Sequence, residues 1–463
     1  MTRFAASSVI PVSSDELYRW HARAGAFQRL MPPWEQMRLL HQSGGIGDGA
    51  RVDFKIRQGP LWLRWEAQHS EHVEGRQFRD TMLRMSGATW THLHRFEPLT
   101  DDSARLVDEI DFAFPLGALG RLGTQAMLRK LRRLFAFRHR RTRDDLLRHA
   151  AFSHRSRLDV AVSGASGLIG SQLCAFLSTG GHRVRRLVRK AADVAASEIA
   201  WDPARGQIDR AALEGVDAVI HLAGESIAGG RWSAARKQSI LASRLDSTRL
   251  LAETIARLER PPRVFVSASA IGFYGDRGEP VDESSGTGTG FLAEVCRAWE
   301  EAADPARAAG LRVVHPRIGM VLAAQGGALK KLLTPFRFGL GGPVGSGKQI
   351  TSWISFDDLI GALYWTLFDE TISGPVNAVS PRAIDNRSFV RTLGAVLRRP
   401  AMLPLPAFAV RLLFGEMGQR LLLDGAAVRP ARLLAAGFPF LHADLETAMR
   451  SELGLLAAPE GFA

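Results

Sequence analysis

Residues 158–181 read LDVAVSGASGLIGSQLCAFLSTGG, and this stretch decides the fold of most of the chain. An apolar run typical of a strand ends at Gly164, and helical periodicity follows Gly170. Glycines spaced in this way permit a tight turn, close approach of backbone N–H groups to a pyrophosphate, and close packing of the helix on the strand. We therefore expect a dinucleotide-binding turn rather than a purely structural one. The residues expected to hold the cofactor here are Gly164, Ser166, Gly167, Leu168, Ile169 and Gly170.

The residues that follow repeat the alternation of strand and helix. The strand candidates are HRVRRLVRK (182–190), DAVIHLAG (217–224) and RVFVSASA (263–270). Helical segments, such as 233–258, lie between them. This order is typical of βαβ units in a doubly wound parallel sheet. The sequence thus predicts an α/β Rossmann domain over 157–385 and a small, mostly helical C-terminal domain over 386–463.

The end of the second strand indicates which dinucleotide binds. An NAD site places Asp or Glu about 20 residues after the glycine turn, where it accepts hydrogen bonds from the ribose hydroxyls. This chain instead has Arg186, Arg189 and Lys190 there. A guanidinium suits the 2′-phosphate of NADP(H), so we expect NADP(H) as the cofactor, with Arg189 and Lys190 binding it. The alternative is that these cations are ordinary surface charges.

Two later strand ends supply further candidates, because open α/β sheets bind their ligands at the carboxyl ends of the strands. A hydroxyl at Ser269 could polarise a carbonyl group, and Tyr274 could donate a proton or simply pack. His221 is expected to be structural. The residues expected to pass close to the cofactor are Leu222, Ala223, Gly224 and Ser267.

Several motifs together resemble a known family. They include GASGLIG (164–170), HLAGESIAGGRW (221–232), SASAIGFYGDRG (267–278), PRIGMVLAAQGGAL (316–329) and SGPVNAVSP (373–381). In this order they resemble the atypical extended short-chain dehydrogenase/reductases of the epimerase family, which are NAD-dependent epimerase/dehydratase-like proteins. The tail from about residue 400 to 445 resembles the small C-terminal domain of that family. The resemblance implies an oxidoreductase or epimerase-like protein that acts on an unidentified carbonyl or hydroxyl substrate, and homodimers in many members.

One departure from the wider superfamily bears on activity. Active extended members carry a Tyr-x-x-x-Lys pair, in which the lysine lowers the pKa of the tyrosine that transfers the proton. With Glu300 taken as the usual downstream glutamate, these two positions fall at Leu292 and Cys296. Ser269 matches the superfamily's active-site serine. The leading hypothesis is hydride transfer, and the alternative is a catalytically silent NADP(H)-binding regulator or scaffold, since some relatives are associated with cell division.

Three other features are candidate parts of the pocket. Asp357 or Asp358 is expected to be either a helix N-cap or a substrate ligand. The glycine-rich segment 341–348 lacks the spacing of a Walker phosphate loop, which favours a lid. Arg317 is expected to meet an anionic group of a ligand or to form a structural ion pair.

The first 150 residues have a different pattern. A strand, a helix, short alternating strands and a long closing helix predict an α+β unit over 1–150. This order resembles the helix-grip proteins of the START and polyketide-cyclase-like (SRPBCC) superfamily. The resemblance implies a ligand-binding domain in which a curved sheet and a helix enclose an apolar cavity for a hydrophobic ligand. Candidate cavity residues are Trp62, Trp65, Phe78, Met82 and Trp90.

Composition limits the remaining alternatives. The chain has 463 residues, of which 46% are apolar and 23% charged, with 60 Lys and Arg against 47 Asp and Glu for a net charge of +13. Two cysteines and no long apolar segment favour a cytoplasmic protein without disulfides, and no metal is expected. The arginine-rich stretch 121–157 is expected to be a solvated helix, which we favour over contact with nucleic acid or a membrane surface.

Overall fold

The computed structural model describes residues 1–83, 89–113, 117–459 and 462, with the backbone alone for 117–122. The chain divides into two compact units. The first comprises Met1–Ser156, Ala175–Gly181 and Leu453–Ala463, and the second comprises Arg157–Cys174 and His182–Glu452. The segment expected as a small C-terminal domain is thus shared: its residues up to Glu452 lie in the second unit, and the rest lie in the first.

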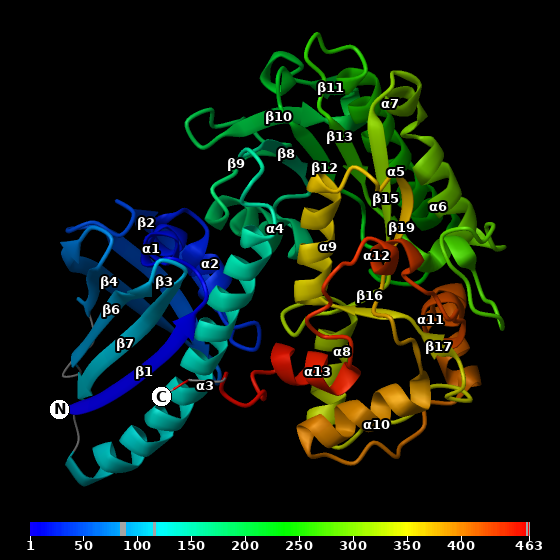
Figure 1. Ribbon diagram of the computed structural model, residues 1–463. Helices are drawn as coiled ribbons and strands as arrows, with labels where there is room; N and C mark the ends of the chain where they lie inside the picture. The colour runs from blue at the N-terminus through cyan, green and yellow to red at the C-terminus, as the bar shows by residue number, and fades with distance from the viewer. Residues whose placement is uncertain (84–88, 114–116, 460–461, 463) are drawn as a thin grey trace. The chain divides into compact units, whose positions relative to one another are not determined.

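The first unit is built on an antiparallel sheet with helices packed against it (Figure 1). Its strands run in the order β1-β7-β6-β5-β4-β3-β2, and every neighbouring pair is antiparallel. The elements are β1 (Thr2–Ile10), α1 (Ser14–Ala22), α2 (Ala26–Leu30), β2 (Met37–Ser43), β3 (Arg51–Gln58), β4 (Leu61–Val73), β5 (Gln77–Met82), β6 (Thr89–Thr100), β7 (Ser103–Ala113) and α3 (Gly117–Ala150). The predicted element order is confirmed, whereas membership of the helix-grip superfamily stays a prediction.

One face of this sheet is covered. The burial pattern of β1 shows this, since every second side chain from Phe4 to Ile10 is buried. Figure 1 shows α3 running alongside β1. Leu131 and Phe135 of α3 pack with Phe4 and with β7. Burying these side chains stabilises the unit by roughly 1.5–3 kcal/mol for each large one.

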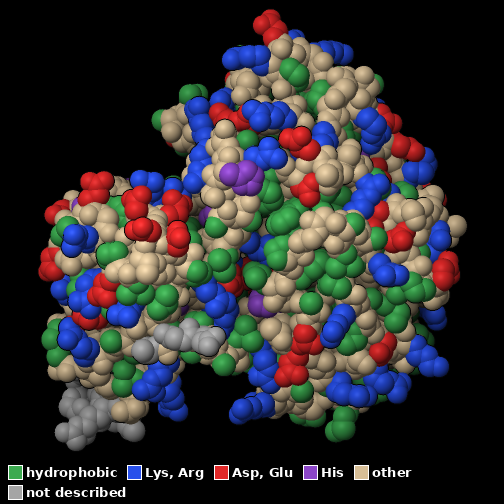
Figure 2. Space-filling model, viewed as in Figure 1, with side chains coloured by type: hydrophobic (Ala, Val, Ile, Leu, Met, Phe, Trp, Pro, Cys, Tyr) green, Lys and Arg blue, Asp and Glu red, His purple; other side chains and the backbone are tan. Residues whose placement is uncertain are grey.

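The predicted long helix in the arginine-rich stretch is present, but the expectation that its charges are solvated is wrong for one face. Arg141 and Arg148 of α3 are buried. Asp145, also on α3, forms a buried ion pair with Arg29 of α2, with 2.6 Å between the Arg29 Nη2 and Asp145 Oδ1 atoms. On the molecular face in Figure 2, Lys and Arg side chains are scattered among Asp and Glu.

The second unit contains the predicted doubly wound sheet (Figure 1). The strands run in the order β11-β10-β9-β8-β12-β13-β15-β14, β19 also pairs with β15, and β10–β11 is the antiparallel pair in this sheet. The elements are β8 (Asp159–Ser163), α4 (Leu168–Thr179), β9 (Arg183–Val188), β10 (Glu198–Asp202), β11 (Gln207–Ile208), β12 (Ala218–His221), α5 (Ala234–Ile255), β13 (Val264–Ser267), β14 (Ser269–Ala270), α6 (Phe291–Glu301), α7 (Asp304–Ala308), β15 (Arg312–Ile318), α9 (Phe356–Phe368) and β19 (Gly374–Ala378).

The central strands are hydrophobic throughout because helices cover both faces of a parallel sheet. All residues of β12 and β13 are buried. The remaining elements of this unit are β16 (Met320–Leu322), α8 (Gly327–Arg337), β17 (Ile350–Thr351), β18 (Trp353–Ser355), β20 (Ile384–Asp385), α10 (Asn386–Leu397), α11 (Ala407–Gly418), α12 (Ala431–Ala435) and α13 (Leu445–Glu452). Over the described part of the chain, no helix has the length and apolar character needed to cross a membrane.

Candidate functional site

The strand order of the second unit indicates the edge of the sheet where a ligand is expected. The order reverses between β8 and β12, which is where open α/β sheets bind ligands, outside the carboxyl ends of the strands. The parallel register aligns Ser163, His221 and Ser267 in one row at this edge. The chain segments that leave β8 and β12, beginning at Gly164 and Leu222, therefore lie next to each other.

The glycine turn has the geometry that its sequence predicts. Gly164 adopts a left-handed conformation with φ of +68°, and a Cβ atom there would lie 2.8 Å from the carbonyl carbon of Leu222. A Cβ atom on Gly170 would lie 2.2 Å from the Gly164 carbonyl oxygen. Ser166 and Gly167 are exposed just before α4 begins at Leu168. A helix that begins at such a turn offers first-turn N–H groups to a phosphate.

The cations after β9 are not equivalent. Arg186 Nη2 lies 3.3 Å from Oε1 of Glu198, and Lys190 Nζ lies 3.2 Å from Oε2 of the same carboxylate. Arg189 is exposed and makes no ion pair or hydrogen bond with any residue that the structure describes. Sequence reasoning grouped these three cations, but the structure leaves Arg189 as the one of them without a carboxylate partner among the described residues.

His221 at the end of β12 has a structural role. It is fully buried, with Nδ1 2.6 Å from the Ser163 hydroxyl and Nε2 3.1 Å from the Ser247 hydroxyl. Burial, together with the Arg244 charge, lowers the pKa of His221 to about 3. The ring is therefore neutral at physiological pH and ties β8, β12 and α5 together. Ser267, expected to contact the cofactor, is also fully buried.

The two candidate catalytic residues, Ser269 and Tyr274, belong to one hydrogen-bonded network. The Ser269 hydroxyl donates to Glu300 Oε1 over 2.7 Å, and Arg317 donates to both oxygens of Glu300 over 2.8 Å. A third Arg317 N–H donates to the Tyr274 hydroxyl over 2.9 Å, and that hydroxyl donates to Asn377 Oδ1 over 2.7 Å. Of the two roles considered for Arg317, the structure shows the ion pair.

The proposed acid role of Tyr274 is not supported. Its side chain has no exposed surface, so it cannot reach a molecule at the carboxyl edge of the sheet in this conformation. Burial outweighs the Arg317 charge and raises the pKa of the Tyr274 hydroxyl. The alternative interpretation, that Tyr274 packs, matches its surroundings in a cluster with Phe273 and Val379.

The two helix positions at which the Tyr and Lys are expected, Leu292 and Cys296, carry no replacement for the pair. A Cβ atom on Gly272 would lie 3.2 Å from Leu292 Cβ and 3.6 Å from Cys296 Sγ, so both positions face the loop that follows Ser269. Leucine has no proton to give, and burial raises the pKa of the Cys296 thiol to about 12. These two residues therefore supply neither the proton transfer nor the positive charge of a Tyr-x-x-x-Lys pair.

Asp358 and the glycine-rich segment make structural contacts, whereas a lid role for that segment stays a prediction. Ser355, rather than an aspartate, caps α9. Asp358 accepts hydrogen bonds from the backbone N–H groups of Leu441 and His442, which ties α9 to the C-terminal segment. In the glycine-rich segment, a Cβ atom on Gly342 would lie 2.0 Å from the carbonyl oxygen of Leu403. The absence of a side chain at Gly342 therefore allows the backbone at Leu403 to pass close to it.

The first unit contains a separate cavity of about 930 Å³. Of the five predicted lining residues, Trp65, Phe78 and Trp90 line it, whereas Trp62 and Met82 do not. A polar group of His and Asp side chains on the sheet also lines the cavity, and sequence reasoning missed it. The signal was present in β6, where THLHRF places two histidines and a phenylalanine on one face of the strand.

Comparisons with known proteins agree with this description. Residues 160–377 match the model of the NAD dependent epimerase/dehydratase family, and residues 405–452 match a domain of unknown function, DUF1731. An epimerase family protein of Mycobacterium leprae is 42% identical over 284 residues, which are 61% of this chain and 92% of that protein.

Two crystal structures extend the comparison. A nucleoside-diphosphate sugar epimerase from Corynebacterium glutamicum is 33% identical, with a TM-score of 0.81 over 99% of this chain and 91% of that one. The human epimerase family protein SDR39U1, solved with NADPH, is 35% identical, with a TM-score of 0.59 over 65% of this chain and 100% of that one. The resemblance inferred from the motifs is thus confirmed: the chain belongs to the NAD dependent epimerase/dehydratase family and carries its DUF1731 segment near the C-terminus.

Proposed function

We propose that the second unit binds NADP(H) at the carboxyl ends of β8 and β12. The observation that carries this proposal is the glycine turn, in which Gly164 and Gly170 leave no room for a Cβ atom and Ser166 and Gly167 are exposed just before α4 begins. Arg189 lies after the next strand, where the 2′-phosphate is bound in NADP(H) sites. The NADPH in the human relative, 35% identical, supports the same assignment.

The reaction class that fits this binding site is hydride transfer between the cofactor and a carbonyl or hydroxyl carbon of a small molecule. The cofactor supplies or accepts the hydride when it is bound. Ser269 lies at the carboxyl edge of the sheet, and its hydroxyl donates to Glu300. Because Ser269 is buried, its proposed role is to position Glu300 and Arg317 beside the site rather than to contact substrate. In carbonyl reduction the alkoxide takes its proton from solvent, and in alcohol oxidation the proton leaves to solvent.

A second candidate function is that of an NADP(H)-binding regulator or scaffold without turnover. It is favoured by Leu292 and Cys296, which occupy the expected Tyr and Lys positions. The complete burial of Tyr274 favours it as well.

The cofactor assignment is tested by calorimetric titration with NADPH and NADH. If Arg189 binds the 2′-phosphate, Arg189→Ser weakens NADPH binding about 10- to 100-fold, the value of a charged hydrogen bond, and leaves NADH binding unchanged. Arg183→Ser is the matched control, because Arg183 is exposed at the opposite end of β9. Equal losses for both coenzymes, or no preference for NADPH in the parent chain, would contradict the assignment.

The choice between the two functions needs a turnover assay. NADPH oxidation is followed with a panel of aldehydes and ketones at saturating cofactor. Measurable turnover that falls in Ser269→Ala supports the reductase. Tight NADPH binding without turnover on any panel member supports the regulator.

We also infer that the first unit holds an apolar ligand. Its cavity is lined by aromatic residues such as Trp65, Phe78 and Trp90. Quenching of tryptophan fluorescence by fatty acids or polycyclic aromatics, lost in Trp90→Asp, is the expected result. Quenching that persists in this variant would place the ligand elsewhere.

A further inference from the structure

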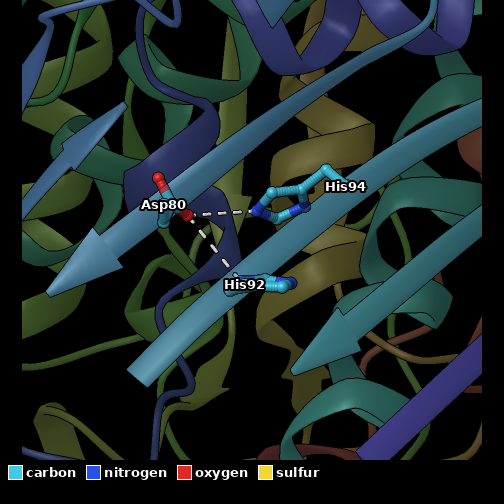
Figure 3. A group of neighbouring side chains, drawn as sticks. All are labelled: Asp80, His92 and His94. Atoms are coloured by element: carbon cyan, nitrogen blue, oxygen red, sulfur yellow. Dashed lines mark hydrogen bonds and ion pairs between the residues drawn. The ribbon is translucent and has the colours of Figure 1, made fainter. Parts of the chain in front are cut away.

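We propose that Asp80, His92 and His94 of the first unit form a binding site for a divalent transition metal, open to the aromatic cavity. Asp80 lies on β5, and the two histidines lie on the neighbouring strand β6 (Figure 3). One ligand atom from each residue lies within 4.8 Å of the other two. All three residues line the cavity.

The strand register brings these side chains together. Asp80 pairs directly with His92, and His94 lies two residues further along β6, so the three side chains share one face of the sheet. Asp80 Oδ2 lies 3.2 Å from His94 Nε2 and 3.7 Å from His92 Nδ1. Two imidazoles and one carboxylate on a rigid sheet form a donor set that suits Zn²⁺ or Fe²⁺ and leaves coordination positions open.

A second carboxylate, that of Asp108, lies on the side of the two imidazole rings opposite Asp80. Asp108 Oδ1 lies 2.7 Å from His92 Nε2 and 2.8 Å from His94 Nδ1, which are the ring nitrogens away from Asp80. The other Asp108 oxygen lies 2.7 Å from His139 Nε2, and His139 Nδ1 lies 2.7 Å from the Ser8 hydroxyl. A carboxylate in this place accepts the imidazole N–H, fixes the tautomer and orients the opposite nitrogen toward a metal.

This arrangement needs a cation between the three groups. His92 Nε2 is hydrogen-bonded to Asp108, whereas His94 Nδ1 lies near the same oxygen outside hydrogen-bond geometry and His94 Nε2 is hydrogen-bonded to Asp80. In the tautomer that turns the Nε2 lone pair of His94 toward Asp80, lone pairs of both rings converge on this carboxylate. Acceptors that converge in a buried site repel each other unless a proton or a metal ion lies between them.

The cluster holds the half-buried carboxylate of Asp80 and the buried one of Asp108, and His69 Nε2 also lies 2.6 Å from Asp80 Oδ1. Arg138, which lines the cavity, supplies one positive charge. If the histidines are neutral, one net negative charge remains to attract a cation.

The competing occupant is a proton. Burial opposes protonation of His94, but the carboxylates of Asp108 and Asp80 outweigh it and raise the pKa of His94 to about 9. In that case the cluster is an internal ion pair. With a metal, the open coordination positions face the cavity, so the matching ligand is an apolar molecule with one oxygen donor. This inference concerns the first unit and stands whether or not the second unit binds NADP(H).

The test is metal binding by the full-length chain after chelator treatment and dialysis. We expect one Zn²⁺ per chain by calorimetry, and one Co²⁺ with d–d absorption bands of nitrogen and oxygen coordination. Asp80→Asn abolishes this binding. Asp108→Asn keeps all three ligands and weakens Zn²⁺ about 10- to 100-fold, as expected for loss of a carboxylate behind the ligands. His41→Gln is the matched control, because His41 is exposed on β2 of the same sheet.

Two results would overturn the proposal. One is the absence of Co²⁺ bands in the parent chain, which would leave the proton as occupant. The other is Zn²⁺ binding that is equal in the parent chain, Asp80→Asn and Asp108→Asn. If Asp80→Asn fails to fold, by circular dichroism, the Co²⁺ spectrum and the Asp108→Asn affinity still decide between metal and proton.

Discussion

Each of the two units contains a network of ionisable residues. The two networks differ in how well their opposite charges are matched, and we call a network balanced when each charge has a partner of opposite charge. In the second unit, Arg317 is matched by Glu300 and by the Tyr274 hydroxyl. In the first unit, Asp80 and Asp108 share histidines whose ring nitrogens face carboxylates on both sides. The first unit's network lines a large cavity, whereas Tyr274 has no exposed surface. Burial of reactive residues therefore does not identify a site. A candidate site is better identified by charges without a matching partner and by side chains that reach a cavity.

The largest expected effect comes from breaking the balanced network. Glu300→Ala leaves the Arg317 guanidinium buried without its carboxylate, which costs about 3–5 kcal/mol of unfolding free energy. Urea unfolding followed by circular dichroism measures the loss. Glu301→Ala is the neighbouring control, because Glu301 is exposed and pairs with Arg297 on the surface, where removal costs at most about 0.5 kcal/mol. Equal, small losses in both variants would show that the buried pair is not structural.

The unbalanced network should instead gain stability from a cation. Zn²⁺ at 100 times its dissociation constant adds about 2.7 kcal/mol to the opening free energy of the segment that binds it. Hydrogen exchange resolved by mass spectrometry should therefore show slower exchange in β5 and β6 when Zn²⁺ is added. Exchange in α6 and β15, around Glu300 and Arg317, should not change. Equal protection of both networks, or of neither, would remove the distinction between them.

The contrast also explains what could be predicted from the sequence. The glycine turn was predictable because its requirements are local: Gly164, Gly167 and Gly170 lie within seven residues, and the critical contact of Gly170 is with Gly164 itself. The Rossmann order of strands and helices was predictable for the same reason, since hydrophobic periodicity and glycine punctuation are local signals.

Burial of Tyr274 and the cluster around Asp80 depend on distant residues. Tyr274 donates to Asn377, which is 103 positions away, and its acid role was plausible until that contact was seen. The alternation in β6 showed that His92 and His94 share a face, but it did not show which strand lies beside them. The expectation of no metal rested on the scarcity of cysteine, which carries no information on ligands assembled from His and Asp across two strands.

A smaller effect is expected from the neutral histidines of the second unit. Burial lowers the pKa of His221 to about 3 and that of His315 to about 4. Below pH 6.5 these histidines are protonated in the unfolded chain but stay neutral in the folded chain. The free energy of unfolding therefore falls as the pH falls from 6.5 toward 4. Each histidine accounts for about 2 kcal/mol at pH 5. Urea midpoints between pH 7 and pH 5 should show this slope, and His221→Asn should flatten it by its own share. An unchanged slope would mean that His221 is protonated in the folded chain.

The smallest expected effect comes from removing a single oxygen atom, the Tyr274 hydroxyl, from the balanced network. Tyr274→Phe removes a hydroxyl that accepts one hydrogen bond from Arg317 and donates one to Asn377, so it should cost about 1 kcal/mol of stability. Because the ring stays buried, NADPH affinity and any turnover should not change. A proton donor to the substrate contributes about 10²- to 10⁴-fold to the rate, so a loss of that size in Tyr274→Phe, with NADPH affinity intact, would restore the acid role. Such a result would also require the loop around Tyr274 to open during turnover, since the hydroxyl is closed off by Arg317 and Asn377 in the structure.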